Sequence, residues 1–581
     1  MNEHRYRWRN RQIREHLSVI DGKIAPTLWL KNGTYLNVFT KKWVTGHIWI
    51  YEDRIIYVGK DEPKNIDGTE IVSCEGKFLV PGYIEPHAHP FQLYNPHRLA
   101  QYASQSGTTT LINDNLMLLF LFEKKKAFSF LDDINDLPVS LYWWCRFDSQ
   151  SALQDEESES FTDNANILSW LKHDAVVQGG ELTNWPKILE GDDLALHWMQ
   201  EAKRLRKPVE GHFPGASEKT LTKMKLLGTD GDHEGMTGKE VMNRIEMGYM
   251  TALRHSSIRP DLQKIIRELQ ELGCDSYDRM MLTTDGSPPS FYENGIINCC
   301  LEIVIQEGVP VEEAYCMASK NAAQYFGIDH RIGSLAPGHV AHINILDAKE
   351  NPHPVSVLAK GKWMKRNGIS CNDYMPFDWR SHGVLPLTLD WDLTKFDMQF
   401  SMPIGIEMMN DVILKPYPII ANTGDDVLDS KNEAFLMLID REGKWQVTTL
   451  LKGFTEELGG LASSFSNTGD ITIIGKNKND LIIAFNRMKE ISGGIVLAQD
   501  GEIIFELPLS LGGMMSEEKI DDLIPSEKQL RELLVSKGYH FGDPIYTLLF
   551  LSSVHLPYIR ITPKGIYDVK RKEVLFPSIM R

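Results

Sequence analysis

Cysteine is scarce in this sequence. Its 581 residues include only seven cysteines, and no two of them are spaced as Cys-x-x-Cys. We therefore expect no disulfide framework, and an odd number of thiols in a long chain is typical of a reducing compartment. Residues 1–16 are rich in Arg and lack the apolar segment of a secretory signal. Both observations favour a cytoplasmic protein.

Long apolar runs and an excess of positive charge are also missing. The run at 116–122 is far shorter than the roughly 20 apolar residues that span a bilayer. The net charge of −17 would repel a phosphate backbone, and no basic stripe is interleaved with aromatic residues. We therefore expect neither a membrane nor a nucleic acid as a partner.

The middle of the chain has a repeating pattern. Between residues 77 and 330, apolar strand-like runs alternate with amphipathic helical stretches, which is typical of parallel β/α units. Eight such strands fit a closed, TIM-like (β/α)8 barrel. The predicted strands are 78–84, 109–112, 139–144, 175–178, 208–211, 228–230, 250–253 and 280–283.

The regions outside this repeat predict two further units. Short strand-like runs at 1–76 and 331–375 flank the repeat, and we expect them to pair into one small β-sandwich. After a linker that contains proline, residues 395–581 combine strand-like and helical runs into a C-terminal α/β domain. The predicted fold class is therefore α/β, with a barrel, a sandwich built from both flanks and a third domain.

Polar side chains follow nearly every predicted barrel strand. Catalytic groups of such barrels gather at the C-terminal ends of the strands. Any one of these residues could cap a turn. Because they recur at the same position of successive β/α units, directly after the strand, a role in a shared functional site is favoured. They are His87, His89, Asn113, Asp114, Asp148, Glu181, His212, His233, Glu234, Arg254, His255 and Asp285.

Histidines and carboxylates within this set are candidate metal ligands. His87 and His89 are one residue apart on a strand, so their imidazoles point to the same side and suit a divalent ion such as Zn, Fe or Mn. Glu181 follows two glycines and offers two oxygens, so we expect it to bridge two ions. The predicted ligands are His87, His89, Glu181, His212, His233 and Asp285.

Two acidic residues are candidate catalytic groups. Asp285 precedes Gly286, so one interpretation is that it only forms a turn. The other strand-end ligands favour the second interpretation, in which Asp285 binds metal and also carries protons. Glu234 adjoins His233, and we expect it to face the substrate as a general acid or base whose pKa burial raises.

Several segments resemble the adenine deaminase family of the amidohydrolase superfamily, in a divergent branch typical of bacilli. The resemblance covers nearly the whole chain, including the C-terminal domain. The matching segments are 80–89 (VPGYIEPHAH), 210–215 (EGHFPG), 232–234 (DHE), 283–285 (TTD), 317–327 (MASKNAAQYFG) and 491–496 (ISGGIV).

The resemblance implies a function and a set of roles. It implies two divalent metal ions, Mn or Fe, and the hydrolysis of adenine to hypoxanthine and ammonia. In this comparison Asp285 resembles the acid that activates the attacking hydroxide and carries its proton to the leaving amine. Glu234 resembles the residue that protonates the purine ring. The expected partners are a small purine and a second copy of the chain in a homodimer.

The chain departs from the family pattern where a substrate would lie. Pro90-Phe-Gln92 replaces Glu-Ser-Ser, Arg254-His-Ser256 replaces Arg-Glu-Gly, and 465–470 (FSNTGD) replaces His-Asp-Ser-His. The candidate substrate-binding residues that remain are Gln92, Arg254 and His255. Two alternatives stay open: an amidohydrolase for another aminopurine, heterocycle or cyclic amide, and a non-catalytic binding protein with structural metals.

Overall fold

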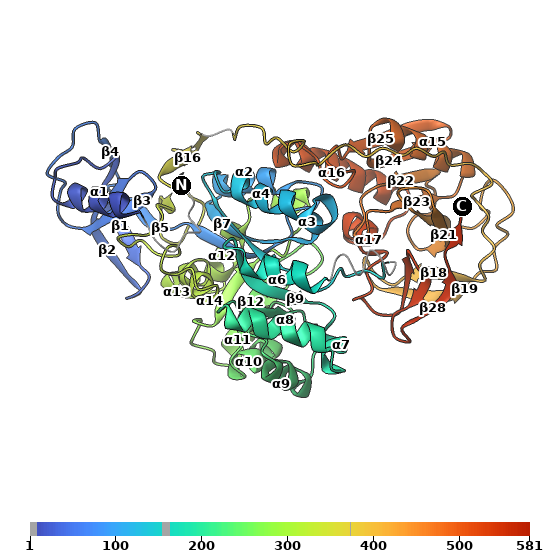
Figure 1. Cartoon of the computed structure of the whole chain (residues 1–581), viewed down its shortest axis with the longest axis horizontal. Coiled ribbons are helices and arrows are strands. Elements are labelled where there is room, and N and C mark those ends of the chain that lie inside the picture. The colour runs from blue at the N-terminus through green and yellow to red at the C-terminus, as the bar shows by residue number, and fades with distance from the viewer. Residues whose placement is uncertain (1–8, 154–162, 372–373) are drawn as a thin grey trace.

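A barrel lies at the centre of the molecule, with one sheet and one domain on opposite sides of it (Figure 1). The computed structural model describes residues 9–153, 163–371 and 374–581. Part of the Arg-rich N-terminus, residues 1–8, lies outside the described residues. Among the described residues, no helix is long and apolar enough to cross a membrane. All seven cysteines are free thiols.

The flanks of the chain combine into one nine-stranded sheet. Residues Ile343 to Leu346 of the second flank pair antiparallel with Phe78 to Pro81, which pair in turn with the first strand. Apolar side chains such as Leu30, Ile50 and Leu358 are buried between them. Helix α1 (Asn10–Ile20) precedes the strands, which are β1 (Leu28–Asn37), β2 (Lys42–Tyr51), β3 (Arg54–Gly59), β4 (Glu70–Ser73), β5 (Phe78–Pro81), β14 (Ile343–Leu346), β15 (Ser356–Ala359), β16 (Lys362–Arg366) and β17 (Ile369–Ser370).

Eight parallel strands form the predicted barrel, which the structure confirms. They follow one another in chain order around the sheet. The strands are β6 (Tyr83–Ala88), β7 (Thr108–Asp114), β8 (Ser140–Cys145), β9 (Val176–Leu182), β10 (Val209–Gly211), β11 (Gly231–Asp232), β12 (Met250–Arg254) and β13 (Met280–Thr283).

Two predicted strands were placed wrongly. The run 78–84 is not one strand: β5 belongs to the flanking sheet, and the barrel strand β6 begins after Gly82. A side chain at Gly82 would collide with Thr109, so glycine allows the close crossing between the two sheets. The sixth strand is Gly231–Asp232 rather than 228–230, because Gly228 ends the preceding helix in the left-handed conformation.

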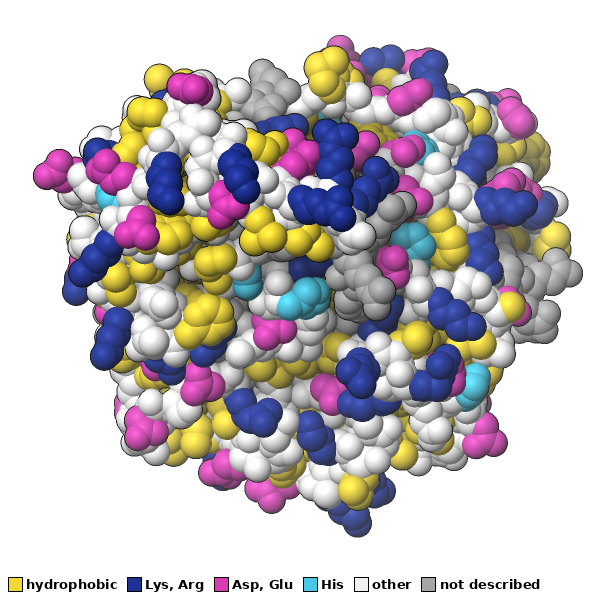
Figure 2. All heavy atoms as spheres, turned by 60° about the vertical axis from the view of Figure 1, so that its left-hand side comes forward, with side chains coloured by type: hydrophobic (Ala, Val, Ile, Leu, Met, Phe, Trp, Pro, Cys, Tyr) yellow, Lys and Arg dark blue, Asp and Glu magenta, His cyan; other side chains and the backbone are white. Residues whose placement is uncertain are grey.

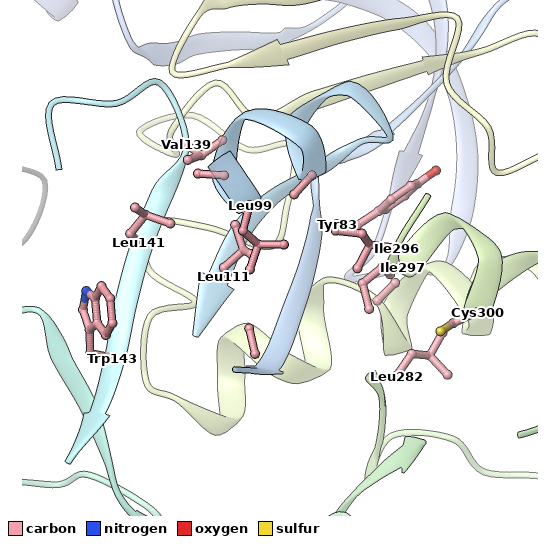
Figure 3. Packing of buried hydrophobic residues seen from close by; sticks show 14 of the residues in the cluster. Tyr83, Leu99, Leu111, Val139, Leu141, Trp143, Leu282, Ile296, Ile297 and Cys300 are labelled. Carbon is pink, nitrogen blue, oxygen red and sulfur yellow. The ribbon is translucent and has the colours of Figure 1, made fainter. Parts of the chain in front are cut away.

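Helices surround the barrel strands and bury their outer faces. Figure 3 shows Leu99 of a helix and Leu111 and Leu141 of two strands within one apolar cluster. The helices are α2 (Pro96–Gln105), α3 (Leu116–Leu121), α4 (Lys124–Ile134), α6 (Asn164–Lys172), α7 (Trp185–Leu189), α8 (Asp193–Arg204), α9 (Glu218–Leu227), α10 (Gly238–Glu246), α11 (Leu262–Glu271), α12 (Ile297–Gln306), α13 (Val311–Met317) and α14 (Lys320–Tyr325), with a short 3-10 helix η1 (Pro289–Tyr292).

The two end strands of the barrel are joined through a buried carboxylate. Glu85 of β6 accepts hydrogen bonds from the Thr283 hydroxyl at 2.6 Å and from the Thr284 amide at 2.9 Å. It also accepts from the backbone amide of His87 at 3.0 Å. Glu85 thus ties the strand that carries the two histidines to the strand that precedes Asp285.

The C-terminal domain has a nine-stranded sheet and a three-stranded sheet. The first contains β18 (Ile404–Met408), β19 (Leu414–Pro418), β20 (Glu433–Ile439), β21 (Trp445–Lys452), β22 (Gly460–Ser463), β23 (Ile471–Gly475), β24 (Gly494–Gln499), β25 (Glu502–Pro508) and β29 (Ile579–Met580); the second contains β26 (Ile559–Thr562), β27 (Gly565–Asp568) and β28 (Glu573–Pro577). Its helices are α15 (Lys478–Glu490), α16 (Ile520–Ser536) and α17 (Pro544–Phe550). Figure 1 shows α16 and α17 on the side toward the barrel. Lys and Arg side chains are interspersed with Asp and Glu on the face in Figure 2.

Candidate metal and catalytic site

The six predicted ligands converge at the C-terminal end of the barrel. Three overlapping groups place one possible ligand atom of each member within 4.8 Å of the others. The groups are His87 with His89 and Asp285, His87 with Glu181 and His233, and His212 with His233 and Glu234. Residues nearly 200 positions apart therefore meet, because each follows or ends a strand of one closed sheet.

His87 and His89 form the first part of the site. The His87 imidazole stacks on Trp144 of β8, with ring centroids 4.4 Å apart. Its Nε2 is buried, has no hydrogen bond among the described residues and lies 3.4 Å from Asp285 Oδ1. His89 lies between two carboxylates: Nδ1 is 2.8 Å from Asp114 and Nε2 is 3.0 Å from Asp285. Burial lowers the pKa of His89, but these two carboxylates outweigh it and raise the pKa to about 9.

Glu181, His212 and His233 form the second part. Glu181 Oε1 lies 2.6 Å from His212 Nδ1 and 3.5 Å from His233 Nε2. The other oxygen, Oε2, accepts a hydrogen bond from Arg146 at 2.8 Å. Only Oε1 therefore faces both imidazoles, whereas the sequence led us to expect that both oxygens would be free to bridge.

Arg146 is a site residue that sequence reasoning missed. It follows β8, is fully buried and also holds Asp114 Oδ2 at 2.7 Å. Asp114 in turn contacts His89, so Arg146 connects the two parts of the site through a continuous set of charged contacts. The sequence signal that could have indicated Arg146 is its position directly after the third barrel strand, β8. Asp148, which the strand-end pattern favoured there, is bound by the Thr183 hydroxyl and the Asn184 amide instead.

The two candidate catalytic acids share one arginine. Arg254 Nη1 lies 2.6 Å from Glu234 Oε1 and 2.6 Å from Asp285 Oδ2, and all three side chains are buried. Arg259 contacts the second oxygen of Glu234. The structure thus places Arg254 against the two acids.

The expected direction of the Glu234 pKa was wrong. Burial by itself raises the pKa of Glu234, but His212, Arg254 and Arg259 together lower it to about 2. Burial also acts to raise the pKa of Asp285, and Arg254 and His89 outweigh it and hold that pKa well below its usual range. Both acids are therefore ionised, because nearby positive charge exceeds the effect of desolvation.

Gln92 and His255, the other two predicted substrate-binding residues, are close in sequence to His89 and Arg254. Neither belongs to the three groups of possible metal ligands. Gln92 is buried three residues after His89, and its Oε1 has no hydrogen bond among the described residues. His255 follows Arg254, packs against Phe291 at a centroid distance of 5.3 Å, and has a pKa that burial lowers.

The C-terminal domain also reaches the site, which the sequence did not indicate. The Tyr546 hydroxyl donates to the backbone carbonyl of Asp285 at 3.1 Å. The His555 ring lies 5.6 Å from the His212 ring. Burial and the neighbouring His212 lower the pKa of His555 to about 3.

The chemistry of the donor set fits divalent metal ions. Imidazole nitrogens and carboxylate oxygens are ligands that Zn, Mn and Fe accept. The unpaired, buried Nε2 of His87 is the sort of atom that a metal would satisfy.

Comparisons with known proteins support the same interpretation. The amidohydrolase family matches residues 78–364, and the adenine deaminase C-terminal domain matches 418–573. A protein of Halalkalibacterium halodurans named "Putative adenine deaminase" is 55% identical, and the alignment covers 100% of both chains. A Bacillus cereus protein of the same name is 54% identical over 100% of this chain and 98% of its own length.

This chain belongs to the adenine deaminase family. A Cereibacter sphaeroides protein named "Adenine deaminase" is 28% identical over 95% of this chain and 98% of its own. Among solved structures, the β-aspartyl dipeptidase of Fervidobacterium islandicum AW-1 is 17% identical, with a TM-score of 0.46 over 60% of this chain and 99% of the other. All six predicted ligands lie within the amidohydrolase match, and Tyr546 and His555 lie within the adenine deaminase C-terminal match.

Proposed function

We propose that this protein is an adenine deaminase that converts adenine and water into hypoxanthine and ammonia. The observation that carries the proposal is the convergence of seven histidine and carboxylate groups at the barrel mouth, among them the acids Asp285 and Glu234, whose pKa values lie below their ordinary range. Full-length relatives with adenine deaminase names support the choice of substrate.

The proposal includes two divalent ions, Mn or Fe, with Zn as the alternative. His87, His89 and Asp285 would hold one ion, and Glu181, His212 and His233 would hold the other. Such ions, when bound, supply activated water for hydrolysis near neutral pH. Because Arg146 donates to Glu181 Oε2, Glu181 would present Oε1 to the metal.

Asp285 and Glu234 would move the two protons of the attacking water. Because neighbouring positive charge, Arg254 included, keeps both carboxylates ionised, each begins the cycle as a proton acceptor. Glu234 would pass its proton to a ring nitrogen of adenine, and Asp285 would pass its proton to the amino group that leaves as ammonia. Arg254 serves in this scheme as a positioning residue for the two acids, and Gln92 and His255 remain the candidates for substrate contact.

A substrate screen tests the proposal. Metal-loaded protein is incubated with adenine, other aminopurines and cyclic amides, and ammonia release is measured, with chelated protein as the control. We expect release from adenine together with stoichiometric hypoxanthine. If only a different heterocycle is turned over, that compound and not adenine is the substrate. If fully metal-loaded protein turns over none of the compounds, a non-catalytic binding protein is favoured.

The proposal also places the enzyme in the cytoplasm as a homodimer. Its seven free thiols agree with a reducing compartment. Sedimentation analysis at micromolar concentration should give a particle of twice the 66.2 kDa chain mass. A particle with the mass of one chain would contradict the dimer.

A further inference from the structure

A segment of the C-terminal domain, residues 543–555, contacts loops at the C-terminal end of the barrel. Helix α17 begins after Asp543, whose side chain accepts from the amides of Ile545 and Tyr546. The Tyr546 hydroxyl donates to the carbonyl oxygens of Asp285 at 3.1 Å and Gly286 at 3.0 Å. The helix is therefore attached to the loop that carries one of the proposed catalytic acids.

The loop after α17 is held from two sides. The Val554 amide donates to the Gln150 carbonyl at 2.9 Å, and Ser553 forms an antiparallel bridge with Ser151, both in the barrel loop after β8. On the other side, the Asn467 amide group donates to the Ser553 hydroxyl at 2.6 Å. Asn467 lies in 465–470, the segment in which this chain lacks the expected His-Asp-Ser-His.

These contacts place His555 beside the proposed metal ligands. Its ring lies edge-on to His212, with centroids 5.6 Å apart and an interplanar angle of 89°. On the helix side it contacts Phe550 at 5.7 Å, and Phe550 contacts Tyr546 at 5.2 Å. Three aromatic side chains of the C-terminal domain thus extend from the Asp285 loop to His212.

His555 also lines a cavity between the barrel and the C-terminal domain. The cavity has a volume of about 400 Å³, and its walls include Asp148, Thr183, Trp198 and Tyr567. That size is within the range of about 300–1,000 Å³ for small-molecule sites. The Nδ1 atom of His555 is buried and has no hydrogen-bond partner among the described residues. His555 thus borders this cavity and also contacts His212, and a buried nitrogen without a partner is free to bind a ligand.

We propose that His555 contacts the heterocyclic substrate directly and that the C-terminal domain thereby completes the active site. The inference rests on the proposed deaminase function and adds a specificity-determining residue to it. The aromatic side chains suit a planar ring, and the imidazole nitrogen suits a hydrogen bond to one nitrogen of that ring. A site of this type rejects an analogue that lacks the paired nitrogen.

The test compares His555→Leu and His555→Asn with the wild type. Leucine removes the hydrogen bond, whereas asparagine keeps a polar group near the Nδ1 position. His540→Leu is the matched control, because His540 belongs to the same domain and its side chain is 69% exposed. Adenine turnover, metal content and thermal midpoint are measured for each protein. Inhibition constants are measured for adenine analogues that each lack one ring nitrogen.

We expect His555→Leu to lower kcat/KM for adenine by about 10- to 100-fold, mainly through KM, with metal content unchanged. The wild type should discriminate against one analogue, and this discrimination should disappear in His555→Leu and return in part in His555→Asn. Equal losses for adenine and all analogues, or loss of metal together with activity, would overturn the substrate contact. An active wild type with unaffected variants would overturn this inference alone, whereas a wild type inactive on adenine would overturn the proposed function.

Discussion

Replacing Asp285 by asparagine separates its proton-carrying role from its place in the fold. Asp285 has a left-handed backbone, with φ of 49°, a conformation that asparagine adopts more readily than most other residues. The side chain has the same size and its oxygen can still face His89, which lies 3.0 Å from Oδ1. The variant should therefore fold and keep its backbone conformation.

The loss expected from Asp285→Asn follows from what the amide cannot do. Oδ2 accepts from Arg254 at 2.6 Å, and an amide nitrogen at that position would be a donor facing a donor. The amide also cannot accept a proton at neutral pH. General acid–base groups contribute about 10²- to 10⁴-fold to rate, so we expect kcat to fall by about 10³-fold, or about 4 kcal/mol of activation free energy. Five proposed ligands remain, so most of the metal should stay bound.

The assay measures ammonia release from adenine and metal content on the same preparations. Asp278→Asn is the control, because the Asp278 side chain is 56% exposed and pairs with Lys41 and Lys320, neither of which is a proposed ligand. The control should match the wild type in both measurements. If Asp285→Asn keeps more than a few percent of the wild-type rate with unchanged metal content, Asp285 does not carry the proton.

Three further predictions concern the supporting residues. Glu181→Gln should lose more metal than His212→Asn in elemental analysis, because Glu181 Oε1 faces two imidazoles; equal losses would contradict the bridge. Arg146→Met should lower the free energy of unfolding by about 3–5 kcal/mol, because it leaves the buried carboxylates of Asp114 and Glu181 without their cation; denaturant titration measures this, and an unchanged midpoint would contradict it. Burial, with a contribution from a neighbouring arginine, lowers the pKa of His97 to about 4, so the neutral form stabilises the fold above pH 6.5 and that stability is lost as pH falls toward 4. Between pH 7.5 and pH 5 the free energy of unfolding should therefore fall by about 2 kcal/mol less in His97→Gln than in the wild type. Equal decreases in the two proteins would show that His97 does not cause the pH dependence.

The barrel and the meeting of its strand-end residues could be predicted because they depend on local pattern. Apolar runs of strand length alternate with amphipathic helical runs, and parallel strands of one barrel all end at the same face. Once that topology is assumed, His87 and Asp285 must lie near each other although they are 198 positions apart in the sequence. The error at Gly82 arose because one continuous apolar run serves two different sheets.

The charge state of the site and the contribution of the C-terminal domain were decided only by the tertiary structure. Burial alone predicts a raised pKa for Glu234. The opposite direction results from His212, Arg254 and Arg259, whose proximity to Glu234 no periodicity reveals. Arg146 takes one oxygen of Glu181 because the residue after β8 lies beside the end of the neighbouring strand β9. His555 reaches His212 across 343 positions through contacts of Tyr546, Ser553 and Val554 with barrel loops. Such through-space electrostatics and packing depend on distances of a few ångströms, which hydrophobic pattern and residue spacing do not specify.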